Sequence, residues 1–266
     1  FRSSEEKYVL NTIKSTFVSS VGEYVNLFEK SVSRYTQTKE AIALVNGTSA
    51  LQIALRIVGV KENDEVITQA LTFVATANAI AFNGAKPIFL DVDYDTMGLS
   101  PDSVENFLFD YGEIRKEGCF NKKTGKKISA CVPMHTFGFP VNMDRLIEVC
   151  KNWNIPIVED AAESLGSKYK NNYTGSMGSL GVFSFNGNKI ITSGGGGAII
   201  TNSIKFAKKA KHISTTAKKP NTFEFYHDQL GYNFRMPNIN AALAFAQMEQ
   251  LEYFISKKRI LAKTYE

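Results

Sequence analysis

Short apolar runs rich in β-branched residues alternate with segments of helical periodicity from residue 41 onward, and this alternation constrains the fold more than any other feature. Such a pattern is typical of βαβ units, in which parallel strands are buried beneath helices. Strands are predicted at 41–45, 65–68, 87–92, 128–134, 155–159, 181–185 and 198–201, and helices at 48–58, 73–82, 144–153, 203–212 and 237–254. The sequence therefore predicts an α/β fold with one mainly parallel sheet running through the chain.

Three segments lie outside this alternation. The amphipathic stretches 5–17 and 24–35 are predicted to be peripheral helices. Segment 111–125 carries three glycines among charged residues and is predicted to be an inserted loop or hairpin. With 266 residues, 44% of them apolar, the chain can bury a large core.

Composition disfavours several classes of protein. The net charge of +5 comes from 31 basic and 26 acidic residues, and the basic runs 115–127 and 205–219 hold few aromatic rings that could stack on bases, so no nucleic acid is expected as a partner. No apolar run reaches the roughly 18 residues that span a membrane. Three cysteines without paired spacing predict neither disulfides nor a metal site, and favour a cytoplasmic location.

A small polar turn, 46–50, joins the first predicted strand of the alternation to its first helix. The free backbone N–H groups of a helix N-terminus, together with the hydroxyls of Thr48 and Ser49, form an anion site. The same residue types also favour an ordinary N-cap. An anion site and a plain cap are therefore both open at this turn.

Two carboxylates, Glu159 and Asp160, end a predicted parallel strand, which is where ligands bind in open α/β sheets. A buried Asp160 needs a cationic partner, such as the protonated ring nitrogen of a pyridine cofactor. The alternatives are an N-cap or a salt bridge with a nearby lysine.

Lys189 follows the strand predicted at 181–185 and precedes four glycines, Gly194 to Gly197. A solvated lysine needs no such neighbours, whereas a lysine that binds pyridoxal phosphate covalently must lie among small residues where a flat cofactor can reach it. Ser184 lies in the same stretch and could help to hold phosphate. The glycines could instead form a simple hairpin turn. The arrangement predicts an enzyme that transfers amino groups.

Three further features each have a functional and a structural interpretation. Phe73, at the start of a predicted helix, could stack on an aromatic ring or belong to the core. The loop 231–237, which contains Asn233, could contact a ligand or cap the helix after it. His135 could act as an acid or base, but it is interpreted as structural because no carboxylate is in register with it.

In their order and spacing, these motifs resemble the DegT/DnrJ/EryC1/StrS family of sugar aminotransferases over nearly the whole chain. The motifs are Asn46 to Ala50, Phe73, Glu159 to Glu163, Ser184 to Lys189, Gly194 to Gly197 and Gly231 to Met236. The resemblance implies a type I pyridoxal phosphate enzyme whose large domain has a mainly parallel seven-stranded sheet flanked by helices. It also implies N-terminal helices at 1–35, the cofactor-binding domain at 36–250, and at 251–266 the start of a small C-terminal domain that is mostly absent from the chain.

The resemblance further implies a role for each site residue. Lys189 would bind pyridoxal 5'-phosphate covalently, and Asp160 would pair with its ring nitrogen. Thr48, Ser49 and Ser184 would hold the phosphate, with Gly47 allowing close approach. Phe73 would stack on the ring, and Glu163 would lie near its phenolic oxygen. Asn233 would reach the phosphate of the partner subunit in a homodimer with a shared active site.

The implied substrates are L-glutamate and a nucleotide-linked 4-keto-6-deoxy sugar. Segment 119–140 looks most like the branch that acts on UDP-4-keto-6-deoxy-N-acetylglucosamine, for cell-surface glycan or nonulosonic acid biosynthesis. The alternatives are a keto-sugar dehydratase, in which histidine replaces the cofactor lysine, and a non-catalytic pyridoxal phosphate-binding protein. A dinucleotide-dependent oxidoreductase is disfavoured because the glycines precede a strand and so lie on the wrong side for a pyrophosphate loop.

Overall fold

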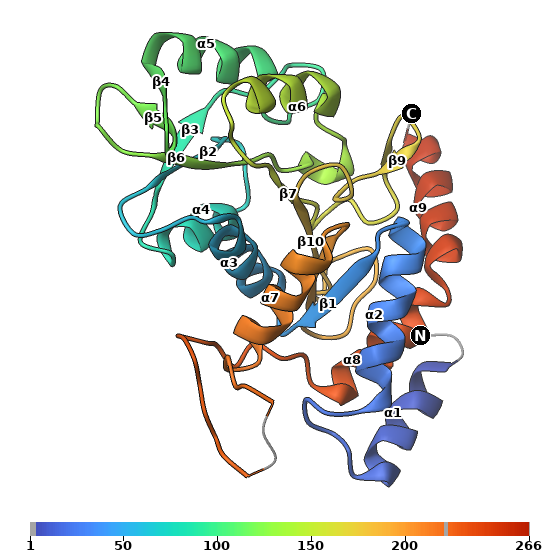
Figure 1. Cartoon of the computed structure of the whole chain (residues 1–266). Helices are drawn as coiled ribbons and strands as arrows, with labels where there is room; N and C mark the ends of the chain where they lie inside the picture. Colours follow the sequence, from blue (N-terminus) through green and yellow to red (C-terminus); the bar gives the residue numbers. More distant parts are fainter. Residues whose placement is uncertain (1–3, 221–222, 266) are drawn as a thin grey trace.

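The computed structural model describes residues 4–220 and 223–265, and within them the strands of the core form two sheets that adjoin along β6 and β7 (Figure 1). A three-stranded part has the order β3-β2-β6 and a four-stranded part the order β7-β10-β11-β1. Two parallel bridges, Cys131–Ile157 and Met134–Asp160, join the two parts between β6 and β7. The strands are β1 (Glu40–Leu44), β2 (Glu65–Gln69), β3 (Lys86–Leu90), β6 (Ile128–Val132), β7 (Val158–Asp160), β10 (Leu180–Ser184) and β11 (Gly197–Thr201).

The prediction of a mainly parallel sheet is confirmed, with one strand running the other way. The pairs β2–β3, β2–β6 and β7–β10 are parallel, whereas β11 is antiparallel to both β10 and β1. A parallel return normally needs a crossover helix, and none lies between β10 and β11. The segment that carries Lys189 and the glycines is therefore a long hairpin connection, which places these residues at the end of β10.

Helices cover both faces of the sheet. They are α1 (Ser4–Ser15), α2 (Glu23–Thr36), α3 (Gly47–Val58), α4 (Val74–Ala81), α5 (Pro101–Tyr111), α6 (Met143–Asn152), α7 (Ile204–Ser214), α8 (Asn238–Met248) and α9 (Leu251–Tyr265). The helix predicted at 237–254 is interrupted at Glu249 and Gln250, so it forms parts of α8 and α9. The prediction omitted α5, although Ser100 caps it and Pro101 follows the cap.

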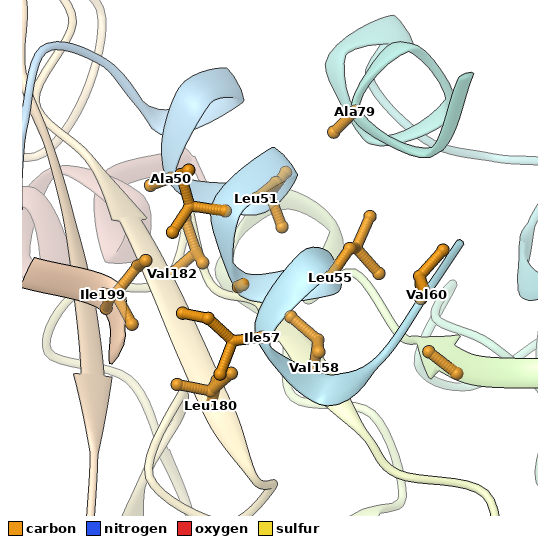
Figure 2. Close-up of a cluster of buried hydrophobic side chains, with 14 of the residues drawn as sticks. Ala50, Leu51, Leu55, Ile57, Val60, Ala79, Val158, Leu180, Val182 and Ile199 are labelled. Atoms are coloured by element: carbon orange, nitrogen blue, oxygen red, sulfur yellow. The ribbon is translucent and has the colours of Figure 1, made fainter. Parts of the chain in front are cut away.

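The core lies in layers on the two faces. Leu44 of β1 packs with α3, α4 and α7, while its neighbour Ala43 packs with α2, α8 and α9. This follows from the alternation of side chains along a strand. Figure 2 shows the first layer, where Ala50 of α3 lies beside Val182 of the sheet and Leu55 of α3 is on the side of the helix toward Ala79. Helices α5 and α6 form a third cluster with β2 and β6.

The segment predicted at 111–125 is a hairpin of β4 (Gly112–Arg115) and β5 (Gly118–Asn121), and a second hairpin joins β8 (Lys168–Tyr169) to β9 (Asn172–Tyr173). Among the described residues, no helix is long and apolar enough to cross a membrane. Helices α1 and α2 pack against α8. The division at 36 and 251 stays a prediction, and residues 1–3 and 266 of its outer units lie outside the described ranges.

Gly197 allows β11 to begin directly against the turn at the start of α3. A Cβ at Gly197 would lie 2.4 Å from the backbone oxygen of Asn46 and 2.8 Å from the nitrogen of Gly47. Because backbone atoms cannot be displaced cheaply, we expect Gly197→Ala to lower the free energy of unfolding by about 1–3 kcal/mol. Urea unfolding measures this, with Gly195→Ala as the control since its Cβ would lie 3.8 Å from the nearest atom. Equal losses in the two variants would contradict the close-approach argument.

Candidate active site

A cavity of about 260 Å³ opens where β7 and β10 end and where α3 and α4 begin. Carboxyl ends of parallel strands and helix N-termini are the usual binding edge of an open α/β sheet. The lining residues are Asn46, Gly47, Thr48, Leu51, Phe73, Ala75, Met134, Asp160, Ala162, Glu163, Ser184, Asn186, Asn188 and Lys189. The cavity thus collects polar groups from the start of α3 and from the ends of β7 and β10 with the loops that follow them, whereas the start of α4 contributes apolar side chains.

Most of the predicted site residues line this cavity, and two do not. Ser49 is buried in α3, and its backbone N–H donates to the Asn46 side chain at 2.7 Å. Asn233 is exposed outside the cavity, where its side-chain oxygen accepts a hydrogen bond from Nε of Arg235 at 3.0 Å. The roles predicted for Ser49 and Asn233 therefore stay predictions.

The turn at the start of α3 combines a cap with an open polar surface. Asn46 is the N-cap residue, because its side chain accepts the N–H of Ser49. Thr48 is left on the cavity wall beside Gly47. A Cβ at Gly47 would lie 2.9 Å from Cβ of Ser184, so the absence of a side chain lets the turn pack on the end of β10. Two hydroxyl groups and a helix N-terminus thereby share one cavity, an arrangement suited to an anion.

Lys189 lies inside the cavity instead of on the surface. Its Nζ is 3.2 Å from Oε1 of Glu163, and 13% of its side chain is exposed. The other oxygen of Glu163 accepts the backbone N–H of Phe137 at 3.1 Å. The Lys189 Nζ is also 5.9 Å from the centre of the Phe73 ring. An amine, a carboxylate and an exposed aromatic ring therefore surround the same space.

Asp160 presents a buried carboxylate to the cavity. Its side chain accepts hydrogen bonds from Oγ1 of Thr76 at 2.8 Å and from the N–H of Ala162 at 3.2 Å. Burial raises the pKa of Asp160, while these hydrogen bonds and the Lys189 charge oppose the rise. The Ala162 contact closes a local turn, and residues 161–167 form turns and not a helix, so the N-cap alternative for Asp160 does not describe this site. The lysine of the cavity pairs with Glu163, so the salt-bridge alternative for Asp160 does not describe this site.

Glu159, the neighbour of Asp160, serves a structural network. Its fully buried carboxylate accepts the backbone N–H groups of Gly175, Met177 and Gly178 at 2.7, 2.7 and 2.5 Å. It also contacts Nε2 of His135 at 3.0 Å. The expectation that no carboxylate is in register with His135 is wrong, because the parallel pairing of Met134 with Asp160 brings the two side chains together.

The tautomer of His135 follows from its neighbours. Its Nδ1 accepts the backbone N–H of Val141 at 3.2 Å, so the proton is on Nε2 and points to Glu159. Both ring nitrogens are satisfied and the side chain is fully buried. These contacts support the structural interpretation of His135.

The network around Glu159 yields a stability prediction. Glu159→Gln exchanges one acceptor oxygen for an NH₂ group that faces backbone donors, which leaves buried N–H groups unpaired. We expect the free energy of unfolding to fall by about 1–3 kcal/mol. Denaturant unfolding measures the loss, and Glu113→Gln is the control because its ion pair with Arg115 is exposed on both sides and worth about 0–1 kcal/mol. A Glu159→Gln variant as stable as the control would show that the hydrogen bonds from the 175–178 loop to Glu159 do not stabilise the fold.

Thr76 is a site residue that sequence reasoning missed. It lies in the first turn of α4, and its hydroxyl contacts a carboxylate 84 residues away in the chain. A threonine near a helix start is common, so its type and position carried no signal for this contact.

The whole chain has recognisable relatives. Residues 1–266 match the DegT/DnrJ/EryC1/StrS aminotransferase family. The GDP-perosamine synthase of Escherichia coli O157:H7 is 38% identical over 262 residues, which cover 98% of this chain and 67% of that protein. The GDP-perosamine synthase of Caulobacter vibrioides is 35% identical over 263 residues, 99% of this chain and 66% of that protein.

A solved structure is similar over most of the chain. Helicobacter pylori PseC, an aminotransferase involved in the biosynthesis of pseudoaminic acid, matches with a TM-score of 0.84 at 26% identity. The match covers 95% of this chain and 64% of PseC. The chain spans 64% to 67% of the length of the curated relatives it matches.

Proposed function

Because the chain belongs to the DegT/DnrJ/EryC1/StrS aminotransferase family, we propose that it transfers an amino group from L-glutamate to a nucleotide-linked 4-keto-6-deoxy sugar. The cofactor of this family is pyridoxal 5'-phosphate. The observation that carries the proposal is the convergence of Lys189, Asp160 and Phe73 on one cavity. Lys189 also disfavours the dehydratase alternative, in which histidine stands at this position.

The residues present fit the cofactor. Among the described residues the buried Asp160 forms no ion pair, because Lys189 pairs with Glu163, and a protonated ring nitrogen would supply a cationic partner. The N-terminus of α3, with Thr48 and Ser184, would hold the phosphate. Phe73 is 62% exposed at the cavity wall and would stack on the ring. When bound, the cofactor withdraws the electron pair that the amino donor leaves on its Cα.

Lys189, Asp160 and Glu163 would each have a separate role in proton transfer. The Nζ of Lys189 would hold the cofactor covalently, and once released would take the proton from the donor Cα. The Asp160 carboxylate would keep the ring nitrogen protonated, since an opposite charge at hydrogen-bonding distance favours the charged form. Glu163, whose Oε1 is 3.2 Å from Nζ, would orient the lysine.

The sugar nucleotide is the finer part of the proposal. Segment 119–140 favours UDP-4-keto-6-deoxy-N-acetylglucosamine, and Met134 of this segment lines the cavity. The names of the two synthases favour a GDP-linked sugar as the second candidate. Offering each keto sugar with L-glutamate and measuring 2-oxoglutarate decides between them. Turnover of the GDP sugar alone would overturn the UDP assignment. Cofactor binding without turnover of either would favour the non-catalytic alternative.

A homodimer with shared active sites is also proposed, supported by the position of Asn233 outside its own cavity. If Asn233 serves the partner subunit, mixing Lys189→Ala with Asn233→Ala protein creates one site that has both native residues. We expect activity above the mean of the two separate variants after subunit exchange. Mixing Lys189→Ala with Asp160→Asn is the control, because both residues line the same cavity and no intact site forms. Activity equal to the mean in both mixtures would reject the shared site.

A further inference from the structure

The anchoring of Asp160 depends on two unlike hydrogen bonds. The N–H of Ala162 contacts Oδ1 at 3.2 Å, and this contact is local because the two residues are two positions apart. The hydroxyl of Thr76 contacts Oδ2 at 2.8 Å from another element, α4. Thr76 is 1% exposed, so water does not compete for this bond. The long-range contact therefore holds the carboxylate in its orientation toward the cavity.

A second threonine supports the first. Oγ1 of Thr72 lies 2.7 Å from Oγ1 of Thr76. When Thr76 gives its only hydroxyl proton to an ionised Asp160, Thr72 must donate to Thr76. A hydroxyl that accepts one hydrogen bond donates a stronger one, so Thr72 reinforces the contact with the carboxylate.

The pair of threonines can also serve a protonated Asp160. In that state the carboxyl O–H donates to Thr76, which in turn donates to Thr72. The Thr72 hydroxyl then has acceptors in Sδ of Met134 at 3.0 Å and the backbone oxygen of Phe73 at 3.4 Å. The chain of hydroxyls is thus complete in either charge state of the carboxyl group.

The same short segment also carries the aromatic wall of the cavity. Phe73 is the N-cap residue of α4, between the two threonines, and its N–H lies 3.4 Å from Sδ of Met134. A shift of the helix start would therefore move the ring of Phe73 and the hydroxyl on Asp160 together. Because Phe73 and Thr76 both belong to the start of α4, the position of the aromatic ring and the orientation of the Asp160 carboxylate depend on the same helix.

We propose that Thr76, supported by Thr72, is a positioning residue that holds the Asp160 carboxylate in line with the cofactor ring nitrogen. The inference rests on the proposed pairing of Asp160 with that nitrogen. Thr76→Val removes the hydroxyl but keeps the branched shape, and Thr76→Ser keeps the hydroxyl. A hydrogen bond to a charged group contributes enough that its loss corresponds to about a tenfold to hundredfold change in an equilibrium.

The test measures the dissociation constant of pyridoxal phosphate, the absorbance spectrum of the bound cofactor, and kcat and KM for L-glutamate. We expect Thr76→Val to bind the cofactor about 10- to 100-fold more weakly, with an altered spectrum and a lower kcat. Thr76→Ser should restore all three, and Thr72→Val should give a smaller loss. In an Asp160→Asn background, Thr76→Val should add less than it does alone.

A control variant at an equally buried threonine distinguishes a positioning role of Thr76 from a purely structural one. Thr36→Val removes from α2 a buried hydroxyl that does not line the cavity and that donates at 2.8 Å to the backbone oxygen of Val32. This variant should change unfolding without changing the spectrum. The inference is overturned if Thr76→Val keeps the native cofactor affinity and spectrum, or if Thr76→Ser is as impaired as Thr76→Val. In either case, a loss of activity in Asp160→Asn leaves the proposed function standing. If Asp160→Asn itself has no effect, the pairing fails and this inference with it.

Discussion

Lys189→Ala is expected to abolish amino transfer and to remove every covalent adduct between the protein and its cofactor. The variant loses both the amine that binds the cofactor and the base that moves the proton. General acid–base catalysis alone contributes about 10²- to 10⁴-fold, and the covalent step adds to this. Turnover should therefore fall by at least that factor. Borohydride reduction followed by mass spectrometry should find an adduct at position 189 in the native protein and none in the variant.

A matched lysine makes the result specific. Lys122 directly follows β5, is exposed and does not line the cavity, so Lys122→Ala should keep both the adduct and the activity. Thermal unfolding of the ligand-free Lys189→Ala protein should remain cooperative, which shows that the loss is chemical. An adduct that persists in Lys189→Ala, or that is trapped on another side chain of the native protein, would remove the basis of the proposed function.

Asp160→Asn is expected to have the second largest effect on activity. The substitution keeps the size of the side chain but removes the negative charge that would pair with the ring nitrogen. Removing one partner of a buried charge pair costs about 3–5 kcal/mol, which corresponds to roughly 10²- to 10⁴-fold in rate. Steady-state kinetics with saturating cofactor measures the fall in kcat. A variant with more than half the native kcat would exclude Asp160 as the partner of the ring.

The same substitution should act in the opposite direction on the stability of the ligand-free protein. Burial raises the pKa of Asp160 in the folded state above its ordinary value of 3.8. A raised folded pKa contributes stability that is full below the unfolded pKa and is lost as pH rises through the folded pKa. At neutral pH the buried native carboxylate is therefore destabilising, whereas the neutral amide of the variant carries no charge to desolvate. Ligand-free Asp160→Asn should unfold at a higher temperature than the native protein at pH 7.

The pH dependence separates this explanation from a general effect of the substitution. The gain in unfolding temperature should shrink as the pH falls toward 4, because the native carboxyl group then becomes neutral as well. With cofactor bound, the native protein should be the more stable one, since the ring nitrogen supplies the missing partner. A ligand-free variant that is less stable than the native protein at pH 7 would show that burial of the charge is not the dominant cost.

Local signals were sufficient for much of the candidate site. Gly47 and Thr48 follow a strand and begin a helix, and Asp160 and Ser184 end strands, so their motifs could be recognised from a few neighbouring residues. The structure brings these residues and Lys189 into one cavity. Ser49 shares the motif of Thr48 but is buried and does not line the cavity, because neighbouring positions on a helix point in different directions.

Contacts between distant segments could not be read in the same way. The hydroxyl of Thr76 and the carboxylate of Asp160 are 84 residues apart, and His135 and Glu159 are 24 apart. Each contact depends on how β6 and β7 are aligned and on where α4 packs, and a shift by one residue would turn the side chains to the other face. The residues next to Thr76 and His135 in the sequence do not indicate which distant side chain each of them contacts.

The amino-acid sequence by itself determined the alternation of strands and helices, the family, and the turns that carry the polar groups, because periodicity, caps and strand ends are properties of short segments. The tertiary structure alone decided that β11 runs antiparallel, that Glu159 clamps a loop while Asp160 faces the cavity, and that Thr76 holds Asp160. These outcomes depend on strand order and alignment, which arise only when segments far apart in the chain pack together.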